Sequence, residues 1–103
     1  MKGDVKITIL EQTIHDSYVK EYGEPEKWTL CSKFDEGDEF ISKSGIQMPE
    51  GFCSWAWGDI QKIALTLGLG GNFINAKPGL FISCCSDGFR PVFFKLERIN
   101  ELE

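Results

Sequence analysis

Four cysteines are the residues of this chain with the clearest capacity for chemistry: Cys31, Cys53, Cys84 and Cys85. Thiolates act as nucleophiles and bind soft metal centres such as zinc or an iron–sulfur cluster. The spacings are irregular and contain no C-x-x-C pair, the pattern that is typical of zinc ribbons and thioredoxin-like motifs. Thiol chemistry, a metal site and small buried hydrophobic side chains are therefore all open to these cysteines.

Cys53 stands directly before the strongest predicted helix, residues 54–67. The first N–H groups of a helix have no partner within the helix, and the helix dipole favours an anion there. Cysteines in this setting often have a lowered pKa and react as thiolates. Cys53 is therefore the candidate catalytic residue. The alternative is a small buried residue that closes the helix start, with Ser54 as the cap.

Cys84 and Cys85 are adjacent on a predicted strand, so their side chains point to opposite faces of the sheet. Either one could join Cys53 in a metal site if the strand packs against the helix start, and Cys31 could complete the ligand set. Three or four thiolates suit zinc or an iron–sulfur cluster.

Trp55, Asp59 and Arg90 form a second set of candidates, for ligand binding. Trp55 falls on the polar face of the helix one turn before Asp59, whereas Trp57 points elsewhere. A partly exposed tryptophan is a typical anchor for a ligand or partner; the alternative is that residues 24–34 cover it. Arg90 could hold an anionic group that Asp59 orients, or it pairs with a nearby acid at the surface.

Hydrophobic periodicity predicts the elements that position these residues. Residues 4–11 alternate as a strand, residues 16–22 form a short helix, and residues 39–43 form a short strand. The helix over residues 54–67 ends at Gly68. Its predicted core face consists of Ala56, Ile60, Ile63, Ala64 and Leu67.

The segment 80–96 predicts a β-hairpin, because Asp87-Gly88 between two apolar runs is a strong signal for a two-residue turn. The more apolar face of the second strand is then on the side of Cys85, which should point inward. Pro91 cannot donate to a ladder and predicts an edge position. The predicted register pairs Cys85 with Arg90, Ser83 with Val92 and Phe81 with Phe94.

These elements predict a single α+β domain over residues 1–103. A small, mostly antiparallel sheet is built from the segments at Val5, Phe40 and 80–98, and the helix packs across one face. A more closed small barrel with the helix as a plug is the alternative.

Composition limits the partners. The net charge is −5 and no long basic run exists, which argues against binding to nucleic acid. The N-terminus has no apolar stretch of signal-peptide length, and the apolar segment 63–69 is too short to span a bilayer. We therefore expect a cytoplasmic protein without membrane association, in a compartment that keeps thiols reduced.

Three blocks, GFCSWAWGDI (51–60), GGNF (70–73) and CCSDGFRPV (84–92), resemble a family of small uncharacterised cysteine-containing proteins found mainly in anaerobic bacteria and archaea. The similarity runs from Val5 to Ile99. In related sequences the position of Cys31 is part of a Gly-x-Cys-Pro-type segment, which this chain lacks, so a ligand role there does not carry over. An anaerobic setting favours iron–sulfur or thiol chemistry. The resemblance implies that the family pattern includes Cys53, Trp55, Trp57, Asp59, Cys84, Cys85, Asp87 and Arg90.

Three functions follow as hypotheses. The first is a metal-bound or redox-active thiol site between Cys53 and the Cys84–Cys85 hairpin. The second is a non-enzymatic module that binds a small anionic ligand or a partner protein through Trp55, Asp59 and Arg90. The third is a structural role as an oligomer that assembles through the edge near Pro91.

Overall fold

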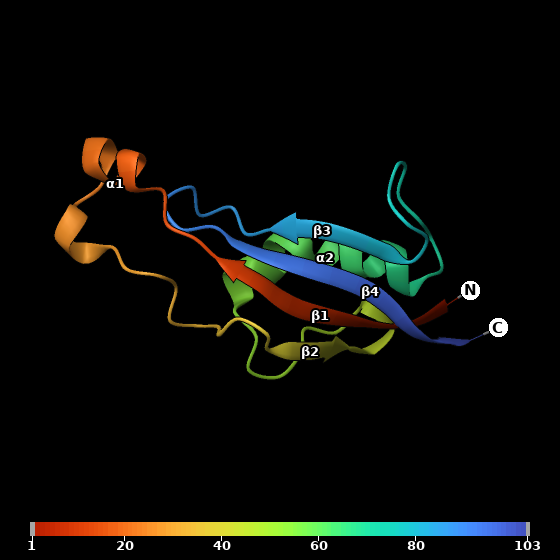
Figure 1. The fold of residues 1–103 in the computed structure, drawn as a ribbon. Coiled ribbons are helices and arrows are strands. Elements are labelled where there is room, and N and C mark those ends of the chain that lie inside the picture. Colours follow the sequence, from red (N-terminus) through yellow and green to blue (C-terminus); the bar gives the residue numbers. More distant parts are fainter. Residues whose placement is uncertain (1, 103) are drawn as a thin grey trace.

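The computed structural model describes residues 2–102, apart from the side chains of residues 25, 101 and 102, and consists of a four-stranded antiparallel sheet with one long helix, α2, across one face (Figure 1). The strand order is β2-β1-β4-β3. The predicted α+β architecture is confirmed. Because the sheet is open, with β2 and β3 at its edges, the closed-barrel alternative is wrong. The elements are β1 (Lys2–Gln12), α1 (Asp16–Tyr22), η1 (Pro25–Lys27), β2 (Glu39–Ser42), η2 (Lys43–Gly45), α2 (Ser54–Gly68), β3 (Leu80–Cys84) and β4 (Val92–Leu102).

The core lies between α2 and the sheet, where the alternating strand pattern meets the apolar face of the helix. Val5, Ile7 and Ile9 on β1 are buried, as a half-buried strand requires. The five residues predicted for the core face of α2 are buried as well. Beneath the start of α2, three aromatic rings pack with centroids 5.0–5.8 Å apart: Phe34, Phe52 and Phe94. This aromatic cluster supports the segment that leads into Cys53.

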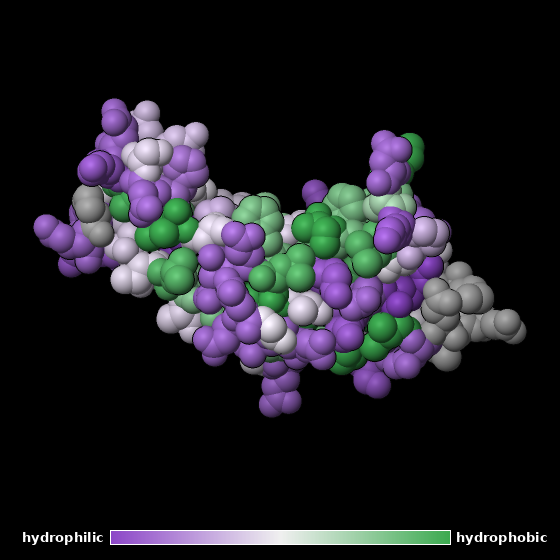
Figure 2. All heavy atoms as spheres, viewed as in Figure 1, coloured by the Kyte–Doolittle hydropathy of each residue, from purple (hydrophilic) through white to green (hydrophobic). Residues whose placement is uncertain are grey.

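The opposite face of the sheet is open to solvent. Figure 2 shows it as apolar side chains interspersed with polar ones. Lys6 on β1 lies 3.5 Å from Glu39 on β2 and from Glu97 on β4, and Lys95 lies 3.5 Å from Glu97 on the same strand. Pairs of opposite charge are typical of such an exposed face and contribute little each.

The predicted two-residue turn between β3 and β4 is wrong. The strands pair with Phe81 opposite Leu96 and Ser83 opposite Phe94, and residues 85–91 form a longer loop. A tight turn of the expected type needs positive φ at both central residues, and neither Asp87 nor Gly88 has it. Instead the Asp87 carboxylate turns the chain by accepting hydrogen bonds from the N–H groups of residues 89 and 90, at 3.0 and 3.3 Å.

The register differs from the predicted one by two residues, and a shift of two keeps every side chain on its face. Cys85 is therefore buried as predicted, 9% exposed, while Cys84 lies on the open face. The N–H of Val92 donates to the Cys85 sulfur at 3.3 Å. The predicted orientation of Cys84 and Cys85 is confirmed although the register was wrong, because the face to which a strand residue points depends on the pleat alone.

Pro91 does not lie at a free edge, so that prediction is wrong. It precedes β4, which is flanked by β1 and β3. Its carbonyl accepts hydrogen bonds from the N–H and the hydroxyl of Thr13, at 3.2 and 2.6 Å. The hypothesis of an oligomer that assembles through an edge near Pro91 therefore has no support from the structure. The strands with an edge open for pairing are β2 and β3. Residues 13–30, which include α1 and η1, form an arm at one end of the sheet (Figure 1).

The far end of α2 rests directly on η2. A Cβ added at Gly68 would overlap the backbone oxygen of Ser44, and one at Gly45 would overlap the carbonyl group of Ala64. Glycine is therefore required at this crossing for close approach. Gly68 is the last residue of α2, and the chain turns away at Gly70, where φ is 97°.

Candidate functional site

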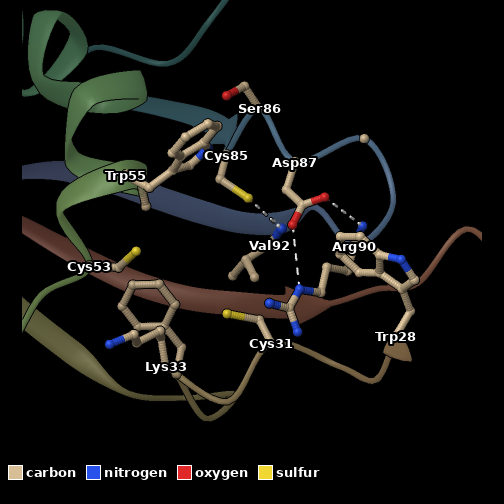
Figure 3. A pocket seen from close by; sticks show the side chains of 13 residues that line it. Trp28, Cys31, Lys33, Cys53, Trp55, Cys85, Ser86, Asp87, Arg90 and Val92 are labelled. Carbon is tan, nitrogen blue, oxygen red and sulfur yellow. Dashed lines mark hydrogen bonds and ion pairs between the residues drawn. The ribbon is translucent and has the colours of Figure 1, made fainter. Parts of the chain in front are cut away.

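A cavity of about 500 Å³ opens where the start of α2 meets the residues 28–34 and the loop 85–91 (Figure 3). Three segments that are distant in sequence build its walls, because the antiparallel sheet brings the loop beside the helix start. The residues that matter chemically are Trp28, Cys31 and Lys33 from the first segment, Cys53 and Trp55 from the helix start, and Cys85, Asp87 and Arg90 from the loop.

Three of the four free cysteines line this cavity. Figure 3 shows the side chains of Cys31, Cys53 and Cys85 directed toward it from three different segments. Cys31 and Cys53 are half-buried, and Cys85 is buried. Cys53 and Cys85 therefore line the same cavity, together with Cys31, to which the resemblance carried no ligand role. A shared chemical site of these cysteines stays a prediction. Cys84 is exposed on the other face of β3 and does not line the cavity.

Among the side chains that the structure describes, no group of three or more from His, Cys, Asp or Glu is arranged to hold a metal ion. A metal site formed by Cys53 together with both Cys84 and Cys85 does not fit the strand geometry, since adjacent strand residues point to opposite faces. The geometry therefore gives the cysteines a shared cavity without a closed set of metal ligands.

The exposed Cys84 thiol has a raised pKa. Desolvation by its neighbours is the largest cause, followed by the nearby Cys85 and by the negative charge of Asp59. Since the thiolate is the reactive form, Cys84 is a poorer nucleophile near neutral pH than its exposure alone would suggest.

Cys53 occupies the N-cap position of α2, with φ −73° and ψ 122°. Its carbonyl accepts the N–H of Trp57 at 2.9 Å, which is the first hydrogen bond of the helix. The interpretation of Ser54 as the cap is wrong, because Ser54 is already helical. The Cys53 side chain makes no capping hydrogen bond, so the thiol is left to face the cavity.

Trp55 is 67% exposed at the cavity wall, so the alternative in which residues 24–34 cover it is wrong. Trp57 is half-buried and packs edge-on against Phe52, with ring centroids 6.3 Å apart. The two tryptophans therefore serve different purposes, as their helical directions indicate. Trp57 belongs to the border of the core, and Trp55 presents a large apolar surface to solvent.

Arg90 is held by three neighbours. Its Nε lies 3.4 Å from the Asp87 carboxylate, its Nη1 donates to the carbonyl of Thr29 at 3.2 Å, and its guanidinium lies 5.2 Å from the centre of the Trp28 ring. Pairing of Arg90 with a nearby acid, the alternative interpretation, is confirmed. Asp59 does not orient Arg90; its carboxylate accepts the N–H of Ser86 at 2.7 Å instead.

Trp28 and Lys33 are the site residues that sequence reasoning missed. Trp28 packs on Phe89, with centroids 4.7 Å apart, as well as beneath Arg90. Both residues lie in a segment without a helical or strand period, and no local signal marks them. Their place at the site depends on how the arm and the residues 31–34 that follow it lie against the loop 85–91 and the start of α2.

The charge of the cavity differs in sign from that of the protein. Its lining contains two cations, Lys33 and Arg90, and one carboxylate, Asp87, in a chain of net charge −5. Among the described residues, no acidic partner lies within ion-pair distance of the exposed Lys33 amine. The cavity therefore combines aromatic walls with a local excess of positive charge.

Comparison of the chain with protein-family models, with curated protein sequences and with solved structures found no match. The resemblance carried by residues 51–60, 70–73 and 84–92 stays a prediction. Within residues 2–102, no helix has the length and apolar character needed to cross a membrane.

Proposed function

We propose that this protein is a binding module for a small ligand with a flat apolar body and an anionic group. The observation that carries the proposal is the cavity itself: about 500 Å³, with two tryptophans and a net positive lining in an acidic chain. Pockets for small ligands are typically concave and mostly apolar, with a few polar groups that orient the ligand.

Each part of the lining has a role in this proposal. The exposed face of Trp55 offers a surface on which a flat ligand stacks. Lys33, whose amine is not paired with any of the acidic side chains that the structure describes, attracts the anionic group. Arg90 is already engaged by Asp87 and Trp28, so it shapes the wall and contributes a weaker charge.

The test is a titration of the reduced protein with aromatic carboxylates, with the uncharged amides of the same compounds as controls, followed by two-dimensional amide NMR spectra. The proposal expects shifts confined to the cavity residues and stronger binding of the carboxylates. Trp55→Ala should weaken binding about tenfold, the amount that corresponds to an aromatic contact of about 1.4 kcal/mol. Leu65→Ala is the matched control, since Leu65 is an exposed apolar residue of the same helix that does not line the cavity.

Two results would contradict the proposal. Shifts of equal size in the wild type and in Trp55→Ala would place the binding elsewhere. Spectra that do not change with any carboxylate or amide would remove the ligand-binding function altogether.

A second candidate is thiol chemistry in the same cavity, and the observation that favours it is that Cys31, Cys53 and Cys85 all line it as free thiols. Zinc or an iron–sulfur cluster has less support, because the described side chains contain no group of three or more suitable ligands. Metal analysis and absorbance spectra of anaerobically purified protein test this: stoichiometric metal would favour the metal form.

Free cysteines are also what supports a cytoplasmic location, where thiols stay reduced.

A further inference from the structure

The cavity thiols differ in how well a molecule in the cavity can reach them. Cys85 is buried, and its sulfur accepts the N–H of Val92 at 3.3 Å. Cys31 and Cys53 are half-buried at the cavity wall. Cys84 is the best exposed thiol, but it lies on the other face of the sheet. A reagent that enters the cavity therefore meets Cys31 and Cys53 first.

Of these two, Cys53 has the better setting for attack. It stands at the N-terminus of the fifteen-residue helix α2, and its side chain makes no capping hydrogen bond. The N-terminus of a helix favours negative charge, which an attacking sulfur carries. Cys31 lies in an irregular segment that lacks this contribution. Trp55, two residues further along the helix, supplies the wall beside the sulfur.

We propose that the cavity is a thiolation site, in which Cys53 forms a mixed disulfide with small aromatic disulfides that carry carboxylates. This inference rests on the proposed function, because the aromatic ring stacks on Trp55 and the carboxylate is attracted by Lys33. Trp55, Lys33 and Cys53 together select one class of reactive ligand, which has a flat body, a negative charge and a bond that a thiolate can break.

The reaction is a thiol–disulfide exchange. The Cys53 thiol loses its proton to water, and its sulfur attacks one sulfur of the ligand disulfide. The new bond joins Cys53 to half of the ligand, while the old sulfur–sulfur bond breaks and its electron pair leaves with the other half as a thiolate. Cys53 is oxidised to the disulfide level and the departing half is reduced to a thiol, so no further oxidant is required.

The test compares two reagents on protein in which Cys84→Ser removes the outer thiol. Dithiobis(nitrobenzoate) is an aromatic disulfide with carboxylates, and dithiodipyridine is an uncharged aromatic disulfide. Stopped-flow absorbance gives the rate of each, and mass spectrometry identifies the cysteine that reacts first. Because both reagents meet the same thiolate, their rate ratio reports recognition of the carboxylates and is independent of intrinsic thiol reactivity.

We expect Cys53 to react first and Cys53→Ser to abolish the fast phase. Lys33→Glu should slow the carboxylated reagent about fivefold relative to the neutral one, and Lys33→Gln about twofold, from the Coulomb energy of exposed charges in water. Lys43→Glu is the control with the same change of net charge. Lys43 is exposed near the opposite end of α2, about 15 Å along the helix axis and beyond the screening length.

Two further outcomes separate this inference from the proposed function. If nitrobenzoate, which has the carboxylate but no disulfide, shifts the cavity resonances while Cys53 stays unmodified, ligand binding stands and thiolation is overturned. If nitrobenzoate causes no shift and the rate ratio is the same in wild type and Lys33→Glu, both fail. First modification of Cys31 or Cys85 also overturns the assignment to Cys53.

Discussion

Arg90 joins the arm to the cavity, and its removal is the sharpest test of how the site is built. Arg90→Met keeps an unbranched side chain of similar length and deletes the charge. It removes the contact with the Trp28 ring, the hydrogen bond to the carbonyl of Thr29 and the ion pair with Asp87. Arg90→Lys is the graded companion, because it keeps the charge but not the planar fork of donors.

The size of the effect follows from these contacts. The hydrogen bond contributes about 1 kcal/mol and the cation–π contact about 0.5–1 kcal/mol at a half-exposed position. The ion pair adds only a few tenths of a kcal/mol, because the Arg90 and Asp87 side chains are 31% and 26% exposed and solvent screens the charges. Arg90→Met should therefore destabilise the protein by about 2 kcal/mol, and Arg90→Lys by about 1 kcal/mol.

Urea unfolding followed by circular dichroism measures the global effect, and amide hydrogen exchange measures the local one. Exchange should quicken most in residues 13–30, since Arg90 and Trp28 tie this arm to the loop 85–91. Lys62→Met is the control, an exposed lysine without an ion pair to any described side chain. An Arg90→Met protein as stable as Lys62→Met, with unchanged exchange in the arm, would refute the reasoning.

Two further predictions concern α2 and its neighbours. Gly68→Ala should destabilise the protein by about 2–4 kcal/mol in urea unfolding, because a Cβ there meets the backbone of Ser44; Gly58→Ala on the same helix, where a Cβ meets nothing within 4 Å, should stabilise it by about 0.5–1 kcal/mol. Equal effects of the two changes would contradict the packing at the crossing. Asp59→Asn should lower the pKa of Cys84, since it removes one of the charges that raise it, while desolvation keeps that pKa above its ordinary value. The rate of Cys84 alkylation by neutral iodoacetamide against pH measures this, and a midpoint that does not move would contradict it.

The pH dependence has a definite sign. A thiol with a raised pKa in the folded protein favours folding in its neutral form, so its contribution is fully present below the pKa of the unfolded chain. That contribution is lost as the pH rises through the higher folded value. Cys84 should therefore make the protein slightly less stable in alkaline solution, and Cys84→Ser should reduce this loss.

Patterns that repeat within a few residues were enough to predict the elements. The alternation of Val5, Ile7 and Ile9 placed β1, and the spacing of the apolar residues in 54–67 placed the buried face of α2. The inward direction of Cys85 was also local, because a strand's pleat assigns neighbouring residues to opposite faces whatever the register. The turn was predicted wrongly, since the hydrogen bonds of the Asp87 carboxylate compete with a tight hairpin.

The composition of the site was decided by contacts between distant segments. Trp28 reaches the cavity because the arm folds back onto the loop 85–91, and Lys33 reaches it from the residues that follow the arm. No periodicity in the segment 24–34 predicts either position. Trp55 stays exposed because nothing from residues 24–34 covers it.

The sequence by itself determined the α+β class, the strands, the helix and the opposite faces on which Cys84 and Cys85 lie, since these depend on backbone periods that act over a few residues. Only the tertiary structure decided that Cys31, Cys53 and Cys85 share one cavity and that Cys84 is left out of it. The physical reason is the strand order β2-β1-β4-β3, which sets the loop 85–91 beside the start of α2. The strand order depends on how all the elements together bury the core, and no short stretch of the sequence contains that information.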